Sequence, residues 1–127
     1  MELIAIVTGL AVLQTFLFAF QVGQARVKHE VNAPAMSGAP EFDRAFRVHA
    51  NTVEQLVIFL PGLWMFGYYV HELTGAIIGM LFIIGRFIYR NAYLSEPQRR
   101  ATGFGLGALS MAVLVLGGMI GAATKLI

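Results

Sequence analysis

Long apolar stretches separated by short polar connections divide the chain into four predicted helices. The first stretch, Leu3–Phe20, contains no charged residue, and neither does the last, Phe104–Ala123. A membrane-spanning helix needs about 20 mainly apolar residues, so each stretch with its flanks is long enough to cross a bilayer. We therefore expect an all-α membrane protein, a four-transmembrane-helix bundle forming one domain over residues 1–127, with spans at about 3–25, 44–70, 73–93 and 101–124.

Composition supports a membrane protein and narrows the possible chemistry. Hydrophobic residues make up 57% of the 127 residues and charged residues 13%, whereas soluble domains average roughly 45–50% and about 25%. The chain has no cysteine, which excludes a disulfide, a thiolate metal site and a cysteine nucleophile. The spacing of His29, His49 and His71 supports no metal site. Any thiol chemistry must therefore use the thiol of a substrate.

Basic residues are concentrated around the first and third connections between the predicted spans. Only Lys125 lies elsewhere; the others are Arg26, Lys28, Arg44, Arg47, Arg86, Arg90, Arg99 and Arg100. Because cytoplasmic loops carry an excess of Lys and Arg, both connections are predicted to be cytoplasmic and both termini to lie outside. The compact loops favour a multi-pass protein of a bacterial inner membrane.

A polar stripe enters the second span. Arg44, Arg47, Asn51 and Glu54 are three or four residues apart, so on a helix they share one face. Charged groups at membrane depth are costly and usually face a bundle interior or a water-filled cavity. The stripe is therefore the first candidate for a ligand site, with Arg44 the member best suited to a structural or interfacial role.

A second polar cluster is predicted at the same end of the bundle. Arg86, Tyr89 and Tyr93 share a face of the third helix, and Arg100 follows the break at Pro97. Gln21 and Arg26 lie at this end of the first helix. Several guanidinium groups, one carboxylate, an amide and two phenols suit a small ligand that carries carboxylates and an amine.

Glutathione has this chemistry, because it combines two carboxylates, an ammonium group, two peptide units and a thiol. Arginines would bind its carboxylates, Glu54 its ammonium group and Asn51 an amide. A cation beside the sulfur lowers the thiol pKa and raises the fraction of nucleophilic thiolate. Arg100, just above the membrane boundary, is the candidate for that catalytic role.

The same residues would also fit purely structural roles. The arginines of the third connection would serve as interfacial anchors, and Tyr89 and Tyr93 as aromatic belt residues. Arg47 and Glu54 would form a structural ion pair, although two helical turns are expected to be too long for direct contact without a bridge such as Asn51. The glycines of the fourth span, Gly103/Gly107 and Gly117/Gly121, fit either packing within one bundle or a subunit interface.

These residues resemble the MAPEG superfamily, the membrane-associated proteins in eicosanoid and glutathione metabolism, and its microsomal glutathione transferase branch most closely. The similarity covers nearly the whole chain. Its most specific part is Glu41–Glu54, which matches the family pattern E-F-x-R-x-x-R-x-x-x-N-x-x-E. Gly85–Tyr93 with Arg99-Arg100, and Gln21–Arg26 with the following Pro/Gly-containing loop, match more weakly.

The resemblance implies a four-helix membrane bundle that assembles as a homotrimer and binds glutathione between subunits. One subunit would supply Arg47, Asn51 and Glu54. The neighbour would complete the pocket, with Arg86 nearby, through Arg26, Tyr89 and Tyr93. Arg100 would stabilise the thiolate, and Gln21 would line the pocket or the adjacent lipid cleft.

Three departures from the family pattern argue against a dedicated eicosanoid synthase. Gln55 replaces a tyrosine of leukotriene-forming members, Val27 replaces a second arginine, and Ala101 replaces a serine of prostaglandin-forming members. The resemblance then favours a detoxification enzyme that acts as a glutathione transferase and also as a glutathione peroxidase. Alternatives are a lipid-binding scaffold of the same family and a small four-span exporter that uses Glu54. Expected partners are glutathione, a lipophilic electrophile or lipid hydroperoxide, membrane lipid and further copies of the chain, but no nucleic acid.

Overall fold

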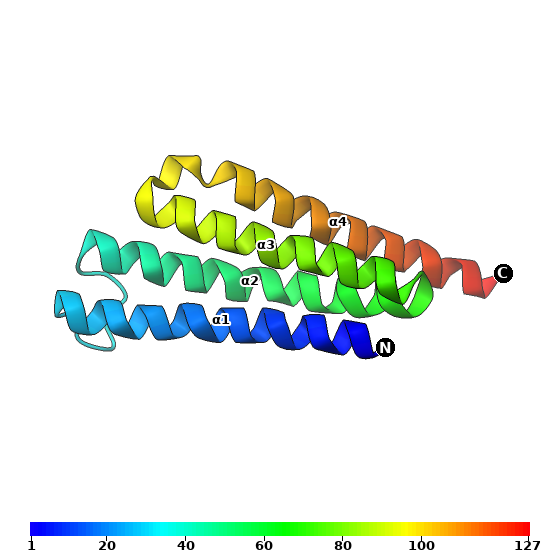
Figure 1. Cartoon of the computed structure of the whole chain (residues 1–127), viewed down its shortest axis with the longest axis horizontal. Coiled ribbons are helices and arrows are strands. Elements are labelled where there is room, and N and C mark those ends of the chain that lie inside the picture. Colours follow the sequence, from blue (N-terminus) through cyan, green and yellow to red (C-terminus); the bar gives the residue numbers. More distant parts are fainter.

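The computed structural model describes all 127 residues and is entirely helical. Four long helices run side by side as an elongated bundle (Figure 1). They are α1 (Glu2–His29), α2 (Pro40–Tyr69), α3 (Glu72–Ser95) and α4 (Ala101–Ala123), with short 3₁₀ turns η1 (Pro97–Arg99) and η2 (Thr124–Leu126). The predicted all-α architecture with four long helices is confirmed.

Local sequence signals explain where the helices begin and end. Glu30 ends α1 in the left-handed region, at φ 54°, and its backbone N–H donates to the carbonyl of Arg26. Pro40 lies in the first turn of α2, where a missing N–H costs nothing. The His71 side chain caps α3 by accepting a hydrogen bond from the Thr74 N–H. Pro97 starts the 3₁₀ turn that separates α3 from α4.

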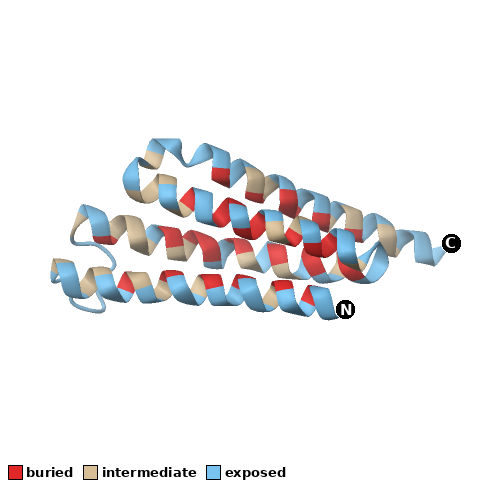
Figure 2. Ribbon diagram, viewed as in Figure 1, coloured by how far each residue is buried: buried red, intermediate tan, exposed pale blue.

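Buried side chains line the inward faces of the helices, as the red bands in Figure 2 show. The largest apolar cluster contains stacked rings of Phe59 and Phe82, whose centroids are 3.9 Å apart. Ile4, Leu63 and Leu114 are fully buried beside them. In a bilayer these side chains would otherwise contact lipid, so close packing rather than transfer from water stabilises this cluster, which is the main core of the bundle. It occupies the half that holds both termini.

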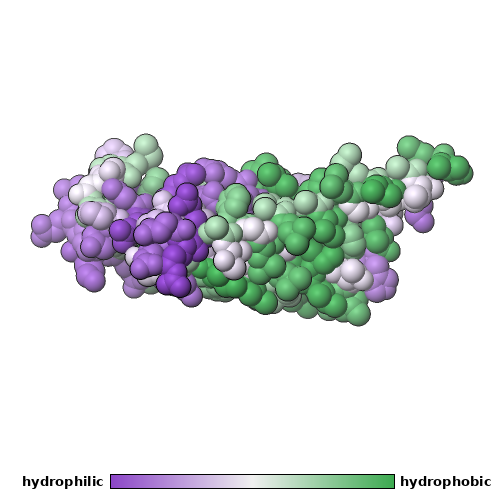
Figure 3. Space-filling model, turned by 90° about the horizontal axis from the view of Figure 1, so that it is seen from above, coloured by the Kyte–Doolittle hydropathy of each residue, from purple (hydrophilic) through white to green (hydrophobic).

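The surface divides along the length of the bundle. One end is hydrophilic, whereas the rest of the visible face is largely apolar (Figure 3). The helices α1, α3 and the segment Pro97–Leu126 are long and apolar enough to cross a membrane. Helix α2 begins with the charged residues of the polar stripe, and its membrane crossing stays a prediction. The stripe lies in the first half of α2, toward the hydrophilic end.

Glycines let α4 approach its neighbours within the same chain. A Cβ added at Gly103 would lie 2.3 Å from the backbone nitrogen of Tyr89 on α3. Added at Gly117 it would meet the Phe66 ring at 2.6 Å, and at Gly121 the Val70 side chain at 2.8 Å. These distances are shorter than van der Waals contact, so the small residues are needed for packing inside one bundle.

Candidate functional site

A polar cleft opens between α2, α3 and α4 at the hydrophilic end of the bundle. Its volume is about 800 Å³, within the range of about 300–1,000 Å³ that is typical of small-molecule sites. The lining residues come from three helices and η1: Arg47, Asn51, Tyr89, Tyr93, Gln98, Arg100, Ala101 and Phe104. Five of the predicted ligand residues, Arg47, Asn51, Tyr89, Tyr93 and Arg100, therefore face one space.

The close contact of α3 and α4 shapes the wall of this cleft. Because Gly103 has no side chain, the α4 backbone reaches the α3 backbone at Gly85 and Tyr89. The rings of Tyr89 and Phe104 consequently come within 6.4 Å of each other. Tyr93 stacks on Tyr89 at 5.5 Å, one helical turn further along α3. The contact therefore fixes the position of the Tyr89 and Tyr93 rings relative to the start of α4.

Arg100 stands at the start of α4 with its charge unpaired. Its Nη1 donates to the carbonyl of Pro97 at 2.8 Å, and its guanidinium lies 6.0 Å from the centre of the Tyr93 ring. No acidic side chain is within ion-pair distance. The neighbouring Arg99 instead pairs with Glu96 at 3.5 Å and does not line the cleft. Arg100 therefore offers an exposed cation to an incoming anion.

Arg47 and Glu54 form a direct ion pair, which corrects the sequence-based expectation that they are too far apart. Arg47 Nη1 lies 3.2 Å from Glu54 Oε1. The two Cα atoms are separated by two helical turns, about 10 Å, and two long side chains that lean toward each other cover this distance. Both side chains are at least half exposed, so the pair itself adds little stability. Arg47 lines the cleft, whereas Glu54 does not line it and is linked to it through this ion pair.

Arg86 lies beneath the cleft floor and does not line the cleft. It is completely buried and donates to Gln55 Oε1 at 3.1 Å, Asn51 Oδ1 at 2.9 Å and Thr52 Oγ1 at 2.8 Å. Its guanidinium also stacks over the Tyr89 ring at 4.2 Å. Arg86 is therefore neither an interfacial anchor nor a group that touches a ligand in this chain. Its contacts orient two cleft residues, Asn51 and Tyr89.

The bond from Arg86 defines which part of Asn51 faces a ligand. The Asn51 amide oxygen accepts from Arg86 Nη2, so its NH₂ group is the part left to interact in the cleft. Asn51 thus presents a hydrogen-bond donor, suited to a carbonyl or carboxylate oxygen. Sequence reasoning missed Thr52 and Gln55 as partners of Arg86. Gln55 lies four residues after Asn51 and shares its helix face, whereas Thr52 directly follows Asn51; no pattern along the chain identifies either residue as a partner of Arg86.

Besides Arg86 and Glu54, two more predicted ligand residues do not line the cleft of this chain. Arg26 donates to the carbonyl of Ala35 at 2.7 Å and lies over the Phe42 ring. Gln21 accepts a hydrogen bond from Arg90 Nε at 2.8 Å and lines a different cavity. The expected structural role of Arg44 agrees with its hydrogen bond to the carbonyl of Leu94.

The resemblance implies that Tyr89 and Tyr93 reach Arg47 and Asn51 from a neighbouring subunit. Within one chain all four residues line the same cleft, and the division of the pocket between subunits stays a prediction. The burial of Tyr89, which is 3% exposed, rules out a role as a membrane-belt aromatic.

Comparison with known proteins identifies the family. The profile of the MAPEG family matches residues 4–120. The human protein named microsomal glutathione S-transferase 2 is 41% identical over 123 residues, 97% of this chain and 84% of the relative. An uncharacterized protein of Synechocystis is 40% identical, over 91% of this chain and 85% of that protein. Mouse leukotriene C4 synthase is 36% identical, over 89% of this chain and 75% of the relative.

The matched region includes all of α2 and α3, nearly all of α1 and α4, and every cleft residue. The apolar helices and this family relationship together make the chain an integral membrane protein. The family relationship also supports glutathione-related transferase chemistry at the level of the family. The chain belongs to the MAPEG family.

Proposed function

We propose that this protein is a membrane-bound glutathione transferase that activates the glutathione thiol for attack on lipophilic electrophiles. The observation that carries the proposal is the convergence of Arg47, Asn51, Tyr89 and Tyr93 with the unpaired Arg100 in one cleft. Relatives named as a glutathione S-transferase and a leukotriene C4 synthase support it. Reduction of lipid hydroperoxides would be a second activity of the same thiolate.

The polar groups of the cleft match those of glutathione. Arg47 would bind a carboxylate of the tripeptide, and Glu54 beside it would bind the ammonium group. The Asn51 NH₂ would donate to a carbonyl or carboxylate oxygen. The two stacked tyrosines would hold the peptide between the helices, with their hydroxyl groups as further hydrogen-bond partners. Arg86 would position Asn51 and Tyr89 without touching the ligand.

Arg100 would act on the reacting sulfur. A guanidinium beside the thiol favours the thiolate, and the thiol proton leaves to water. The thiolate then attacks the electrophilic carbon; a C–S bond forms, and the electron pair leaves with the departing group or is protonated after addition. The electrophile would reach the sulfur from the lipid side, where Phe104 and Ala101 provide apolar surface.

The proposal includes a homotrimer in a membrane, with the first and third connections on the cytoplasmic side and a bacterial inner membrane as the location. In such an assembly, Arg26 from one subunit would reach the cleft of its neighbour. This would require the Arg26 side chain to leave the Ala35 carbonyl. Glutathione from the cytosol and electrophile from the lipid would then meet at the boundary of the apolar surface (Figure 3).

Glutathione binding and conjugation by the purified protein in lipid nanodiscs test this function. We expect saturable glutathione binding and conjugation of a small lipophilic aryl halide. Glu54→Gln should weaken glutathione binding about tenfold or more, because an ammonium group loses its carboxylate. Glu96→Gln is the matched control, since Glu96 pairs only with Arg99 outside the cleft. A wild-type protein that binds lipid but no glutathione would overturn the proposal and favour the lipid-binding scaffold.

A further inference from the structure

A second cavity lies at the hydrophilic end of the bundle, between α1, α2 and α3. Its volume is about 290 Å³, slightly below the range of about 300–1,000 Å³ that is typical of whole small-molecule sites. It shares no lining residue with the cleft that contains Arg100. The residues around it are Phe18, Gln21, Gln24, Ala25, Lys28, His29, Ala45, Val48, Arg90 and Leu94.

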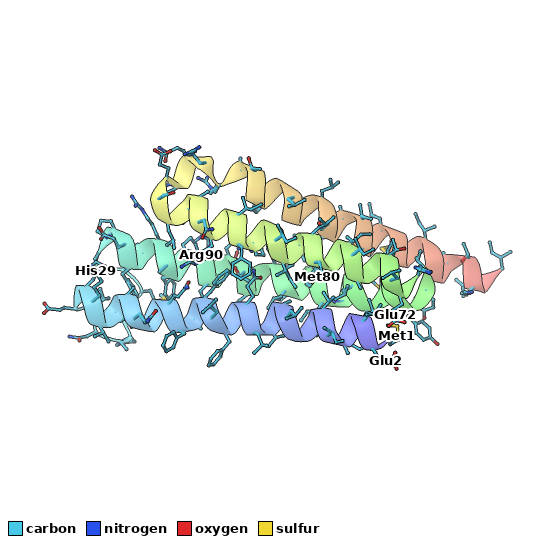
Figure 4. The ribbon with its side chains drawn as sticks, viewed as in Figure 1. Met1, Glu2, His29, Glu72, Met80 and Arg90 are labelled. Carbon is cyan, nitrogen blue, oxygen red and sulfur yellow. The ribbon has the colours of Figure 1, made fainter.

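The polar part of this cavity carries positive charge without a matching negative charge. Lys28 and His29 come from the last turn of α1, and Arg90 comes from α3. Figure 4 shows His29 and Arg90 in the same half of the bundle. None of them belongs to an ion pair of the structure, and no carboxylate lines the cavity. The two cations Lys28 and Arg90 attract an anion, and the His29 imidazole adds a hydrogen-bonding group.

Neutral amide groups hold Arg90 in position. Its Nε donates to Gln21 Oε1 at 2.8 Å, and its Nη1 donates to Asn91 Oδ1 at 2.8 Å. Both bonds use neutral acceptors, so the charge of the guanidinium is not cancelled. Its second terminal nitrogen makes no hydrogen bond, which leaves N–H donors for a phosphate oxygen. The Arg86 guanidinium differs, because both of its terminal nitrogens already donate hydrogen bonds.

The other walls of the cavity are apolar. Phe18 is buried, at 1% exposure, and Val48 at 2%, and they form the deep side with Ala25, Ala45 and Leu94. Next to the cavity, Leu17 and Phe20 expose 40% and 58% of their surface on the outer face of α1. A ligand whose charged head meets Lys28 and Arg90 would therefore find an apolar surface for a hydrocarbon chain.

We propose that this cavity binds the headgroup of an anionic phospholipid from the surrounding membrane. The phosphate would lie between Lys28 and Arg90, and an acyl chain would follow the exposed apolar face of α1. Basic pockets between transmembrane helices are a recognised arrangement for anionic lipid headgroups. A volume of about 290 Å³ accommodates a headgroup while the chains remain in the bilayer. Bound lipid would connect α1 and α3 through non-covalent contacts, at the end of the bundle that contains the Arg100 cleft.

Native mass spectrometry of the detergent-solubilised protein, titrated with phosphatidylglycerol or phosphatidylcholine, tests this site. We expect tighter binding of phosphatidylglycerol. Each cation near a lipid surface contributes about a fivefold gain in affinity, so Lys28→Gln with Arg90→Gln should reduce phosphatidylglycerol binding by more than tenfold. Arg99→Gln is the matched control, because it removes a cation at the same end but outside the cavity. Equal binding of both lipids, or an unaffected double variant, would overturn the proposal.

Three further measurements test the cavity itself and distinguish a lipid headgroup site from a free-anion site and from the glutathione cleft. Ala25→Phe should fill the cavity and abolish the preference for phosphatidylglycerol over phosphatidylcholine, although all cations remain. This variant tests the site even if the double variant fails to fold. Inorganic phosphate should compete poorly; competition as strong as that of phosphatidylglycerol would identify a free-anion site and contradict the lipid assignment. Glutathione should not displace the lipid, because its proposed cleft has no residue in common with this cavity. Displacement by glutathione would contradict the existence of a separate site.

Discussion

Arg86 and Arg100 lie in the polar half of the same bundle, but their surroundings differ. Arg86 is fully buried and donates to three neutral oxygens of α2. Arg100 is exposed, and its single hydrogen bond goes to the nearby Pro97 carbonyl. The two residues have the same charge and both contact the aromatic wall of the cleft. Burial and occupied donors distinguish an arginine that supports the site from one that can meet a ligand.

The support that Arg86 provides has a physical cost. A buried cation without a carboxylate loses its hydration and regains only hydrogen bonds to neutral groups. One donor, Nε, has no partner. In return, the guanidinium fixes the orientation of Asn51 and packs on Tyr89. An apolar side chain at this position would leave the three α2 oxygens without a donor.

Replacing each arginine by leucine gives the largest expected contrast in stability. Arg86→Leu should lower the free energy of unfolding by about 3 kcal/mol or more, because buried acceptors lose their donors. Arg100→Leu, at an exposed position, should change it by less than about 0.5 kcal/mol. Denaturant-induced unfolding in detergent micelles, followed by helical circular dichroism, measures both. Equal losses in the two variants would remove the distinction between a supporting and a free arginine.

A smaller effect is expected when the contact of α3 with α4 is widened. Gly103→Ala places a Cβ against the backbone of Tyr89, so the helices must separate, at a cost of about 1–3 kcal/mol. The shift moves Arg100 relative to Tyr93 and should reduce conjugation activity more than tenfold. Gly105→Ala is the matched control, because no atom lies within 4 Å of its added Cβ. It should keep activity and gain up to about 1 kcal/mol from helix propensity. Equal activity in the two variants would show that the contact does not position the site.

The sequence predicts the helices and most of the cleft because the relevant signals are periodic. Apolar stretches predict the four helices, and the spacing of Arg47 and Asn51 predicts their common face. The depth of Arg86 does not follow from this pattern. Its spacing on α3 matches that of a cleft residue, and only the packing of α2 against α3 shows that its donors are used. The direct Arg47–Glu54 contact is likewise not predictable, because side-chain reach along a helix depends on rotamers rather than on spacing.

Side-chain partners across helices account for the remaining differences. Gln55, which departs from the family pattern, accepts a hydrogen bond from Arg86. Gln21 holds Arg90 beside the second cavity. Neither contact follows from a periodic pattern, because each joins residues far apart in the chain. The small-residue pattern of α4 fits packing and assembly equally well, and the close approach of Gly103 to Tyr89 supports packing.

The central claim is that Arg100 stabilises the glutathione thiolate, and thiolate absorbance in a stopped-flow experiment tests it most directly. Wild-type protein mixed with glutathione should develop the ultraviolet absorbance of a thiolate. Arg100→Ala should lose most of this signal while still binding glutathione through Arg47 and Glu54. Arg99→Ala, which changes the adjacent arginine outside the cleft, should keep the signal. Full thiolate formation and turnover in Arg100→Ala would contradict the assignment of Arg100 as the thiolate-stabilising residue.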